Sequence, residues 1–243
     1  DHYLLNGAKT YISNGINADY IVVAAKTDPE NNRHAMALCV VERGMEGFDR
    51  GRNLDKMGMK GQDTAELFFN NVKIPKDNIL GDPAKGFHYL MQGLAEERLI
   101  AAVQCVSSAR IAFDLTRDFV MARKVFGKPL SAMQNTQFKM AEMETEIDIT
   151  ETFIDHCVAL HNSGELTVAR AAKAKLQASE VEWRMLDLGV QLHGGAGYMQ
   201  VYRISRMFQD SRVNRIWAGT SEVMKLIIGR EVFSDEYSSR INQ

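Results

Sequence analysis

Residues 87–123 form the longest uninterrupted run of helix-favouring sequence in the chain. The run contains no proline and a single interior glycine, Gly93, and it is dense in Ala, Leu, Val and Ile. Proline and glycine are the residues that most often end or kink a helix. We therefore expect one helix that is far longer than average.

Further helices are expected after this run, separated by breaks that contain glycine and proline. Their expected ranges are residues 132–162, 166–192, 202–211 and 221–233. Three long helices joined by short connections favour an antiparallel bundle.

The first 80 or so residues have a different character, with short runs of β-branched, aromatic and apolar residues. The expected strands are residues 3–5, 10–13, 21–25, 35–41 and 65–70, and the turn signals between them include Asn6-Gly7, Asn14-Gly15, Asp28-Pro29 and Glu46-Gly47. This punctuation predicts an antiparallel sheet or barrel. The sequence thus predicts an α+β protein, with a β domain at residues 1–82 and a helical domain at residues 83–243.

Composition narrows the class of function. A net charge of -2 gives no electrostatic case for binding nucleic acid or an anionic membrane. The three cysteines, Cys39, Cys105 and Cys157, are far apart in sequence and favour a reducing compartment. We expect no apolar run of about 18 residues, the length of a membrane span, and no targeting segment.

One acidic residue in the long helix stands out. At helical spacing Leu90, Leu94, Glu97, Ala101 and Cys105 share a face, which predicts a carboxylate in a packed stripe. A carboxylate held in such a place is a candidate general base. The alternative is structural: Glu97 pairs with Arg98 or reaches solvent.

Several motifs occur in a fixed order along the chain. They are Lys9-Thr10-Tyr11-Ile12-Ser13-Asn14-Gly15, Ala122-Arg123-Lys124-Val125-Phe126-Gly127-Lys128, Gln191-Leu192-His193-Gly194-Gly195-Ala196-Gly197-Tyr198 and Trp217-Ala218-Gly219-Thr220-Ser221-Glu222. Together they resemble the acyl-CoA dehydrogenase family of flavoenzymes over essentially the whole chain. The resemblance is nearest to the long-chain branch, through Lys56-Met57-Gly58 and the residues from Gln62 to Phe69.

The resemblance implies a fold with an N-terminal helical domain, a middle β domain and a C-terminal four-helix bundle. This chain would hold the later part of the β domain and the bundle, and its start without methionine suggests a sequence that begins further upstream. The resemblance implies an acyl-CoA substrate, FAD as cofactor and an electron-transfer flavoprotein as partner. It also implies a homodimer or homotetramer, located in the mitochondrial matrix of a eukaryote or the cytoplasm of a bacterium.

By the same resemblance, several residues would bind FAD. Tyr11 and Ser13 would contact the flavin, Arg123 and Phe126 the pyrophosphate and adenosine part, and Thr220 and Glu222 the chain on the adenine side. Gln191, Gly194 and Gly195 would reach the ADP part of FAD from the neighbouring subunit. Each set has a structural alternative: Tyr11 packs on the barrel, Arg123 is a solvated charge at a helix C-terminus, and the glycines cap a helix.

The last motif bears on mechanism. Many relatives have a catalytic Glu immediately before Gly-Thr, where this chain has Ala218, while a minority place the base before Arg-Leu on the first long helix, as in Glu97-Arg98-Leu99. The resemblance therefore implies that Glu97 takes the α-proton while hydride passes from the β-carbon to flavin N5, giving a trans-2-enoyl-CoA.

Other groups would assist this base. The backbone N–H of Ala218 would bind the thioester oxygen, and Arg98 and Gly219 would lie on the substrate side. Glu96 is the competing acid, displaced by about 100° around the helix. Two other functions stay open: an acyl-CoA oxidase that uses dioxygen, and a non-catalytic protein on the same fold.

Overall fold

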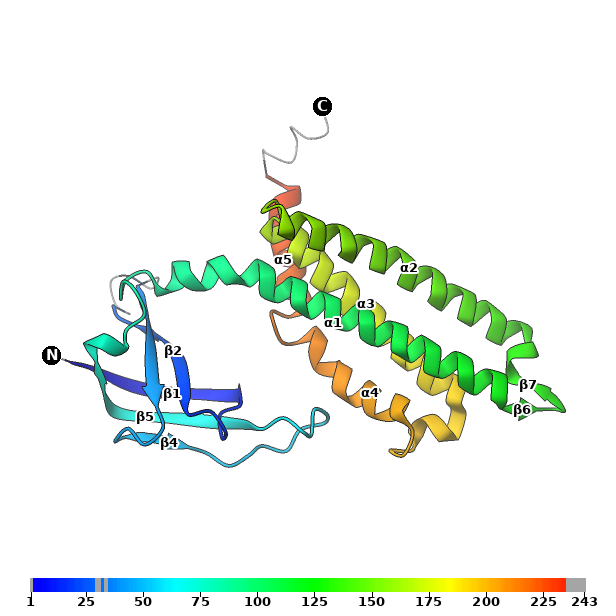
Figure 1. The fold of residues 1–243 in the computed structure, drawn as a ribbon, viewed down its shortest axis with the longest axis horizontal. Coiled ribbons are helices and arrows are strands. Elements are labelled where there is room, and N and C mark those ends of the chain that lie inside the picture. Colours follow the sequence, from blue (N-terminus) through cyan, green and yellow to red (C-terminus); the bar gives the residue numbers. More distant parts are fainter. Residues whose placement is uncertain (1, 29–31, 33–34, 235–243) are drawn as a thin grey trace. The chain divides into compact units, whose positions relative to one another are not determined.

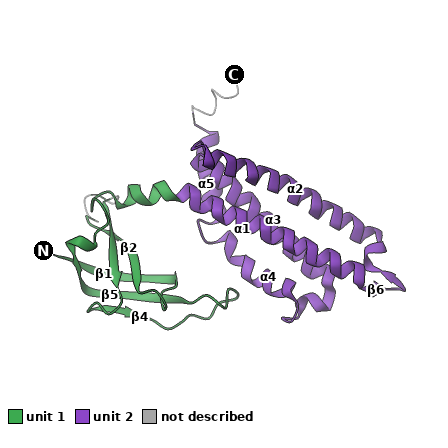
Figure 2. Cartoon of the chain, in the orientation of Figure 1, with its two compact units in different colours: residues 1–93 green, residues 94–243 purple. Residues whose placement is uncertain are grey.

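The computed structural model describes residues 2–28, 32 and 35–234 and divides the chain into two compact units. Unit 1 is Asp1–Gly93 and unit 2 is Leu94–Gln243 (Figure 2). Unit 1 therefore includes the first two turns of the long helix. There the Tyr89 hydroxyl accepts a hydrogen bond from the Asp82 N–H at 3.1 Å, and a Cβ on Gly86 would lie 2.5 Å from the Met36 carbonyl oxygen.

Unit 1 contains two antiparallel sheets (Figure 1). One has the strand order β1-β5-β4 and the other pairs β2 with β3. The strands are β1 (His2–Ser13), β2 (Tyr20–Lys26), β3 (Met36–Glu42), β4 (Phe48–Arg50) and β5 (Thr64–Pro75). Inward-facing residues of both sheets form one apolar core, which includes Val41, Leu67, Val72 and Ile74.

The first strand differs from the sequence-based prediction. A turn was expected at Asn6-Gly7, but β1 continues through it with a shift in its register against β5 between Leu5 and Gly7. Gly7 has a φ of 139°, a value that only glycine adopts readily. Asn6-Gly7 therefore forms a bulge and not a turn, because β1 pairs with the long strand β5 on both sides of these two residues. The short strand β4 was not predicted.

The helices agree closely with the predicted ranges. They are α1 (Gly86–Ala122), α2 (Gln134–Asn162), α3 (Val168–His193), α4 (Arg203–Ser211) and α5 (Ser221–Val232), with a small hairpin of β6 (Lys124–Val125) and β7 (Lys128–Pro129) between α1 and α2. The predicted α+β class is confirmed, with a β-rich part followed by a helical part (Figure 1).

Small side chains contribute to the core that the three long helices share. Fully buried alanines from α1 and α3 lie in the same two clusters as larger residues of α2, such as Met143, Ile147 and Ile154. The alanines are Ala102, Ala109, Ala112, Ala174 and Ala178. Packing of this kind, rather than intrinsic propensity, supplies most of the stability of helices in proteins.

Among the described helices, α1 alone is long and apolar enough to cross a membrane by length and composition. This corrects the expectation that no apolar run reaches that length. The core helix of a soluble protein passes the same test, so one such helix is weak evidence for a span. Here α1 contributes Leu99, Cys105 and Val106 to the core of unit 2.

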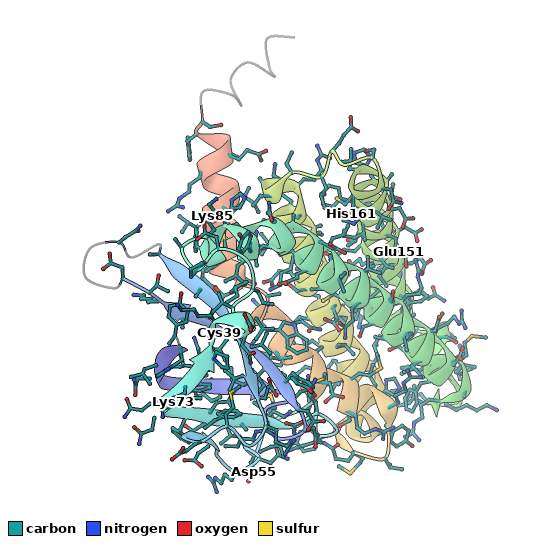
Figure 3. All side chains as sticks on the ribbon, turned by 60° about the vertical axis from the view of Figure 1, so that its left-hand side comes forward. Cys39, Asp55, Lys73, Lys85, Glu151 and His161 are labelled. Atoms are coloured by element: carbon teal, nitrogen blue, oxygen red, sulfur yellow. The ribbon has the colours of Figure 1, made fainter. Side chains whose placement is uncertain are left out.

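A cluster of charges joins α1 to α2. The guanidinium of Arg110 on α1 lies 2.8 Å from Glu144 and 2.7 Å from both Asp148 and Glu151, three acids of α2 (Figure 3 labels Glu151). These hydrogen bonds, with that to Glu151 the largest contribution, raise the pKa of Arg110. One cation is thus shared by three acidic side chains and reduces the repulsion among them.

Replacing Arg110 should therefore weaken the helical unit. We expect Arg110→Met to lower the free energy of unfolding by about 1–2 kcal/mol, because three acids lose their shared partner. Arg117→Met is the matched control, since the ion pairs of Arg117 among the described residues are with Asp114 and Asp118 of its own helix. We expect it to cost less than about 0.5 kcal/mol. Chemical denaturation of both variants checks this, and equal losses would contradict a helix-joining role.

Candidate active site

The loop before α5 has an unusual backbone. Ala218 has a φ of 51° and Gly219 a φ of 92°, so two consecutive residues lie in the left-handed region. This conformation is strained for alanine, and such strain concentrates at functional sites. Ala218 is exposed. Thr220 then caps α5, its hydroxyl oxygen accepting a hydrogen bond from the Val223 N–H at 3.3 Å.

A lysine of α3 holds this loop from inside the unit. The Lys175 side chain is fully buried, and its Nζ donates a hydrogen bond to the Gly219 carbonyl oxygen at 2.7 Å. Burial lowers the pKa of Lys175, and the charge of nearby Arg98 on α1 lowers it further. Lys175 therefore ties α3 to the loop that contains Ala218.

Glu180 of α3 holds the loop on both sides. One of its carboxylate oxygens accepts hydrogen bonds from Arg215 Nε at 2.9 Å and from the Ser221 hydroxyl at 2.8 Å. Arg215 precedes the strained residues and Ser221 follows them. The two ends of the loop are thus tied to a single carboxylate.

Two residues further along α3, Glu182 is 3% exposed and accepts a hydrogen bond from Asn214 Nδ2 at 2.7 Å. Burial raises the pKa of Glu182, although hydrogen bonds from Asn214, Ser108 and Cys105 oppose the shift. Burial, and then the charge of Glu182, raise the pKa of the Cys105 thiol. This thiol is therefore protonated, and Cys105 acts as a core residue rather than a nucleophile.

On α1 the structure corrects the predicted apolar stripe, because Glu97 is exposed while Arg98 and Leu99 are buried. Cys105 lies in the core, and at 3.6 residues per turn Glu97 is about 80° away from it, whereas Arg98 is only about 20° away. The predicted stripe therefore does not follow the face of α1 that is buried in the core. The described residues also show no ion pair between Glu97 and Arg98.

Arg98 takes the buried position in place of its neighbour. Its side-chain atoms Nε and Nη1 are buried and have no hydrogen-bond partner among the described residues. Burial lowers the pKa of Arg98, and the charge of Glu97 partly offsets this. Unpaired buried donors are costly, so Arg98 marks this end of unit 2 as a place where an acceptor is missing.

Tyr11 and Ser13 lie in unit 1, at the end of β1. Both are exposed, and Ile12 between them is half-buried, as the predicted alternation requires. Tyr11 also has a φ of 61° at a second shift of register, between Lys9 and Ile12, which the sequence did not predict. The cavity of about 610 Å³ in this unit is lined by residues 3–9, 23–27 and parts of β3 and β5, and includes neither Tyr11 nor Ser13.

Five of the other predicted cofactor residues lie where α1 and α3 end. Phe119, in the last turn of α1, stacks on His193, the last residue of α3, at 4.1 Å between ring centroids. Arg123 follows α1 and is exposed, as is Phe126 with 97% of its surface accessible. Gln191, Gly194 and Gly195 are exposed too, and a Cβ added at either glycine would meet no atom within 4 Å.

The predicted site residues of unit 2 therefore fall into two groups. One group is Glu97 and Arg98, near the start of the part of α1 in this unit, together with Ala218, Thr220 and Glu222 in and after the loop that Lys175 holds. Arg123 and Phe126 follow the other end of α1. At 1.5 Å per residue, the helix from Glu97 to Ala122 spans roughly 37 Å.

Sequence reasoning missed Lys175, Glu180 and Glu182, the three residues that hold the loop. A signal was present: Ala171, Lys175, Ala178 and Glu182 recur at intervals of three and four residues, which places the two charged residues on the buried face of α3. A charged residue on an otherwise apolar face is a buried-polar signal, and such groups need partners.

Comparison with known proteins agrees with this geometry. The model of the acyl-CoA dehydrogenase C-terminal domain matches residues 84–233, and that of the acyl-CoA dehydrogenase middle domain matches residues 1–72. The chain belongs to the acyl-CoA dehydrogenase family, which confirms the resemblance found in the sequence motifs.

Individual relatives are similar over almost the whole chain. The long-chain specific acyl-CoA dehydrogenase of Rattus norvegicus mitochondria is 45% identical over 235 residues, which cover 96% of this chain and 55% of the rat protein. The crystal structure of an acyl-CoA dehydrogenase from Geobacillus kaustophilus is 47% identical with a TM-score of 0.94, covering 96% of this chain and 62% of that one. The chain thus spans little more than half the length of these relatives.

A third relative is described with its cofactor. The acyl-CoA dehydrogenase complexed with FAD from Bacillus anthracis is 30% identical, with a TM-score of 0.90, and the match covers 98% of this chain and 44% of that one.

The buried carboxyl of Glu182 gives a pH-dependent prediction. Its pKa is raised in the folded protein, so the unfolded chain loses this proton at lower pH than the folded one does. The free energy of unfolding therefore falls as pH rises from the unfolded pKa, about 4.3, to the raised folded pKa. We expect the stability of Glu182→Gln relative to wild type to increase between about pH 4 and about pH 8.

Denaturant titrations at several pH values measure this difference. Glu142→Gln, which removes an exposed carboxylate from α2, is the control for the loss of one charge. A relative stability of Glu182→Gln that stays flat or decreases with pH would contradict the assignment.

Proposed function

We propose that this chain forms the catalytic part of an FAD-dependent enzyme that converts a fatty acyl-CoA thioester to a trans-2-enoyl-CoA. The observation that carries the proposal is the presence of two complementary elements in unit 2. One is the segment of α1 with the exposed Glu97, and the other is the loop where Ala218 offers a backbone N–H but no acidic side chain. Lys175 of α3, bonded to the Gly219 carbonyl, holds the second element from inside the unit.

Several exposed groups among the described residues have the chemistry needed to bind FAD. The exposed Arg123 guanidinium suits a pyrophosphate, because it can bind phosphate oxygens in bidentate fashion. The bare backbone at Gly194 and Gly195 permits close approach of a ligand. The exposed rings of Phe126 and Tyr11 offer stacking surfaces. When bound, FAD supplies the acceptor for the hydride that leaves the β-carbon.

Glu97 would act as the general base and take the α-proton of the thioester. An exposed carboxylate on α1 is open to a substrate outside the bundle, which a carboxylate in the core would not be. The negative charge that develops on the thioester oxygen needs fixed hydrogen-bond donors. The Ala218 N–H would be one of them, since replacing an acid by alanine leaves the backbone donor unchanged.

The remaining proposals concern the substrate, the electron acceptor, two further cofactor contacts and the location. The similarity to long-chain enzymes favours a fatty acyl chain, and an electron-transfer flavoprotein would accept the electrons. Thr220 and Glu222, at the start of α5, would contact the cofactor. The protein would be located in the mitochondrial matrix if its source is a eukaryote and in the cytoplasm if its source is a bacterium.

The base is tested by substitution in the full-length holoenzyme. We expect Glu97→Gln to slow the anaerobic bleaching of bound flavin by acyl-CoA about 100- to 10,000-fold, because the α-proton loses its acceptor. Glu96→Gln is the matched control, since it removes the adjacent exposed acid. Unchanged bleaching in Glu97→Gln would overturn the assignment, and recovery when Ala218→Glu is added would support it further.

The electron acceptor is tested with the same preparation. Turnover with an artificial electron acceptor and little turnover with dioxygen supports a dehydrogenase, and the reverse result supports an oxidase.

We further propose that two copies of the chain complete each FAD site. The two groups of predicted cofactor residues in unit 2 are separated by roughly 37 Å of helix. A single cofactor is too short to contact both groups in one chain. A twofold arrangement would bring Arg123, Phe126 and the glycines of one subunit to the loop of the other.

Complementation between two inactive variants tests this arrangement. We expect Glu97→Gln and Arg123→Ala each to be nearly inactive as homo-oligomers. In randomly mixed dimers about a quarter of all sites would hold both native residues, so co-expression should restore about a quarter of the activity. No recovery in verified mixed dimers would show that both residues act from one subunit.

A further inference from the structure

We propose that Lys175 is a positioning residue of this site: its buried ammonium group fixes the Gly219 carbonyl and thereby orients the Ala218 N–H toward the substrate oxygen. The inference rests on the proposed function and adds a residue that the sequence motifs did not include.

The burial of Lys175 is the first observation. The side chain is fully buried on the alanine-rich face of α3, beside the fully buried Ala171, Ala174 and Ala178. An ammonium group in such surroundings is costly unless it is hydrogen-bonded, whereas an apolar side chain of the same length has no such cost. The cost indicates that the group does something that an apolar side chain would not do.

The partner of Lys175 is the second observation. Its Nζ donates to the Gly219 carbonyl at 2.7 Å, a charge-assisted hydrogen bond. Gly219 has a φ of 92°, and glycine moves easily among several backbone conformations. Fixing its carbonyl removes that freedom directly next to Ala218. The N–H of Ala218 is then held in one direction, which a hydrogen-bond donor in a transition state requires.

The surroundings of the loop are the third observation. Glu180 already ties Arg215 and Ser221, and Glu182 ties Asn214, so both ends of the loop are fixed from α3. Lys175 is the α3 residue that holds the strained middle. Of the three, it alone bonds to the backbone of the residue after Ala218. Its role is therefore local to the donor, while the two acids anchor the ends of the loop.

The positive charge of Lys175 also contributes, in addition to its hydrogen bond. Lys175 places a positive charge behind the loop, on the side of the core. Positive charge in a region of low dielectric stabilises negative charge that develops nearby. Both effects favour the charge-separated transition state over the bound substrate, so they should act on kcat more than on KM.

Lys175→Met in the full-length holoenzyme is the test. It removes the donor and the charge while keeping most of the side-chain volume. Lys173→Met is the matched control, because Lys173 lies on the same helix and bonds Glu231 of α5 at 2.7 Å, away from the loop. Expected results are a fall in kcat of about 10- to 100-fold for Lys175→Met, a KM changed less than about threefold, and near-native kinetics for Lys173→Met.

A spectroscopic measurement reads the hydrogen bond itself. Infrared difference spectra of bound trans-2-enoyl-CoA, labelled with ¹³C at the thioester carbonyl, report how strongly donors polarise that carbonyl. The native holoenzyme and Lys173→Met should shift the stretch to lower wavenumber, and Lys175→Met should lose most of this shift. A full shift in Lys175→Met would overturn the proposal, as would equal kinetic losses in both variants.

Two further variants keep the outcomes separable. If Lys175→Met does not fold or does not retain flavin, Lys175→Arg replaces it in the test. Lys175→Arg keeps a charged donor and should therefore preserve the shift of the carbonyl stretch. Loss of the carbonyl shift in a folded, flavin-containing Lys175→Arg variant would count against the proposal. Glu97→Gln should preserve the shift while abolishing proton removal. Normal flavin bleaching in Glu97→Gln would contradict the proposed function, in which Glu97 is the base. A full carbonyl shift in Lys175→Met, with slow bleaching in Glu97→Gln, would contradict only the role of Lys175.

Discussion

The hydrogen bond from Lys175 to the Gly219 carbonyl connects the core of the helical unit to a strained loop. One face of α3 does two tasks. Its alanines let α1 and α2 pack closely, and its charged residues, spaced at the same helical period, hold the segment before α5. The loop is therefore as rigid as the helix behind it, so a backbone donor at Ala218 is set by the packing of the bundle.

The sequence was sufficient for the helices because their ends are marked locally. Gly127-Lys128-Pro129 separates α1 from α2, and Gly194, with a φ of 59°, ends α3. In the β-rich unit the same kind of signal was misleading. Asn6-Gly7 reads as a turn, but cross-strand pairing with β5 carries β1 through it as a bulge. Pairing between distant strands is a tertiary interaction that no local pattern contains.

The candidate site was predictable as a set of residue types and less so as geometry. The pairing of an acid at Glu97 with the absence of one at Ala218 is visible in the sequence. The orientation of Glu97 was wrong, because small angular errors add up along a long helix and the buried side chain is that of Arg98. Lys175 was overlooked because lysine is rarely buried, although its position among alanines marks it as a core residue.

The length of α1 links fold to assembly. The part of α1 in unit 2, from Leu94 to Ala122, spans a distance greater than the length of one cofactor. Residues at its two ends therefore cannot serve the same bound molecule within one chain, yet both ends carry exposed groups suited to FAD. The Arg123 end offers a cation, an aromatic ring and bare glycine backbone, and the Glu97 end offers the strained loop and an exposed acid. If both ends bind FAD, a second copy of the chain is needed for either site to be complete.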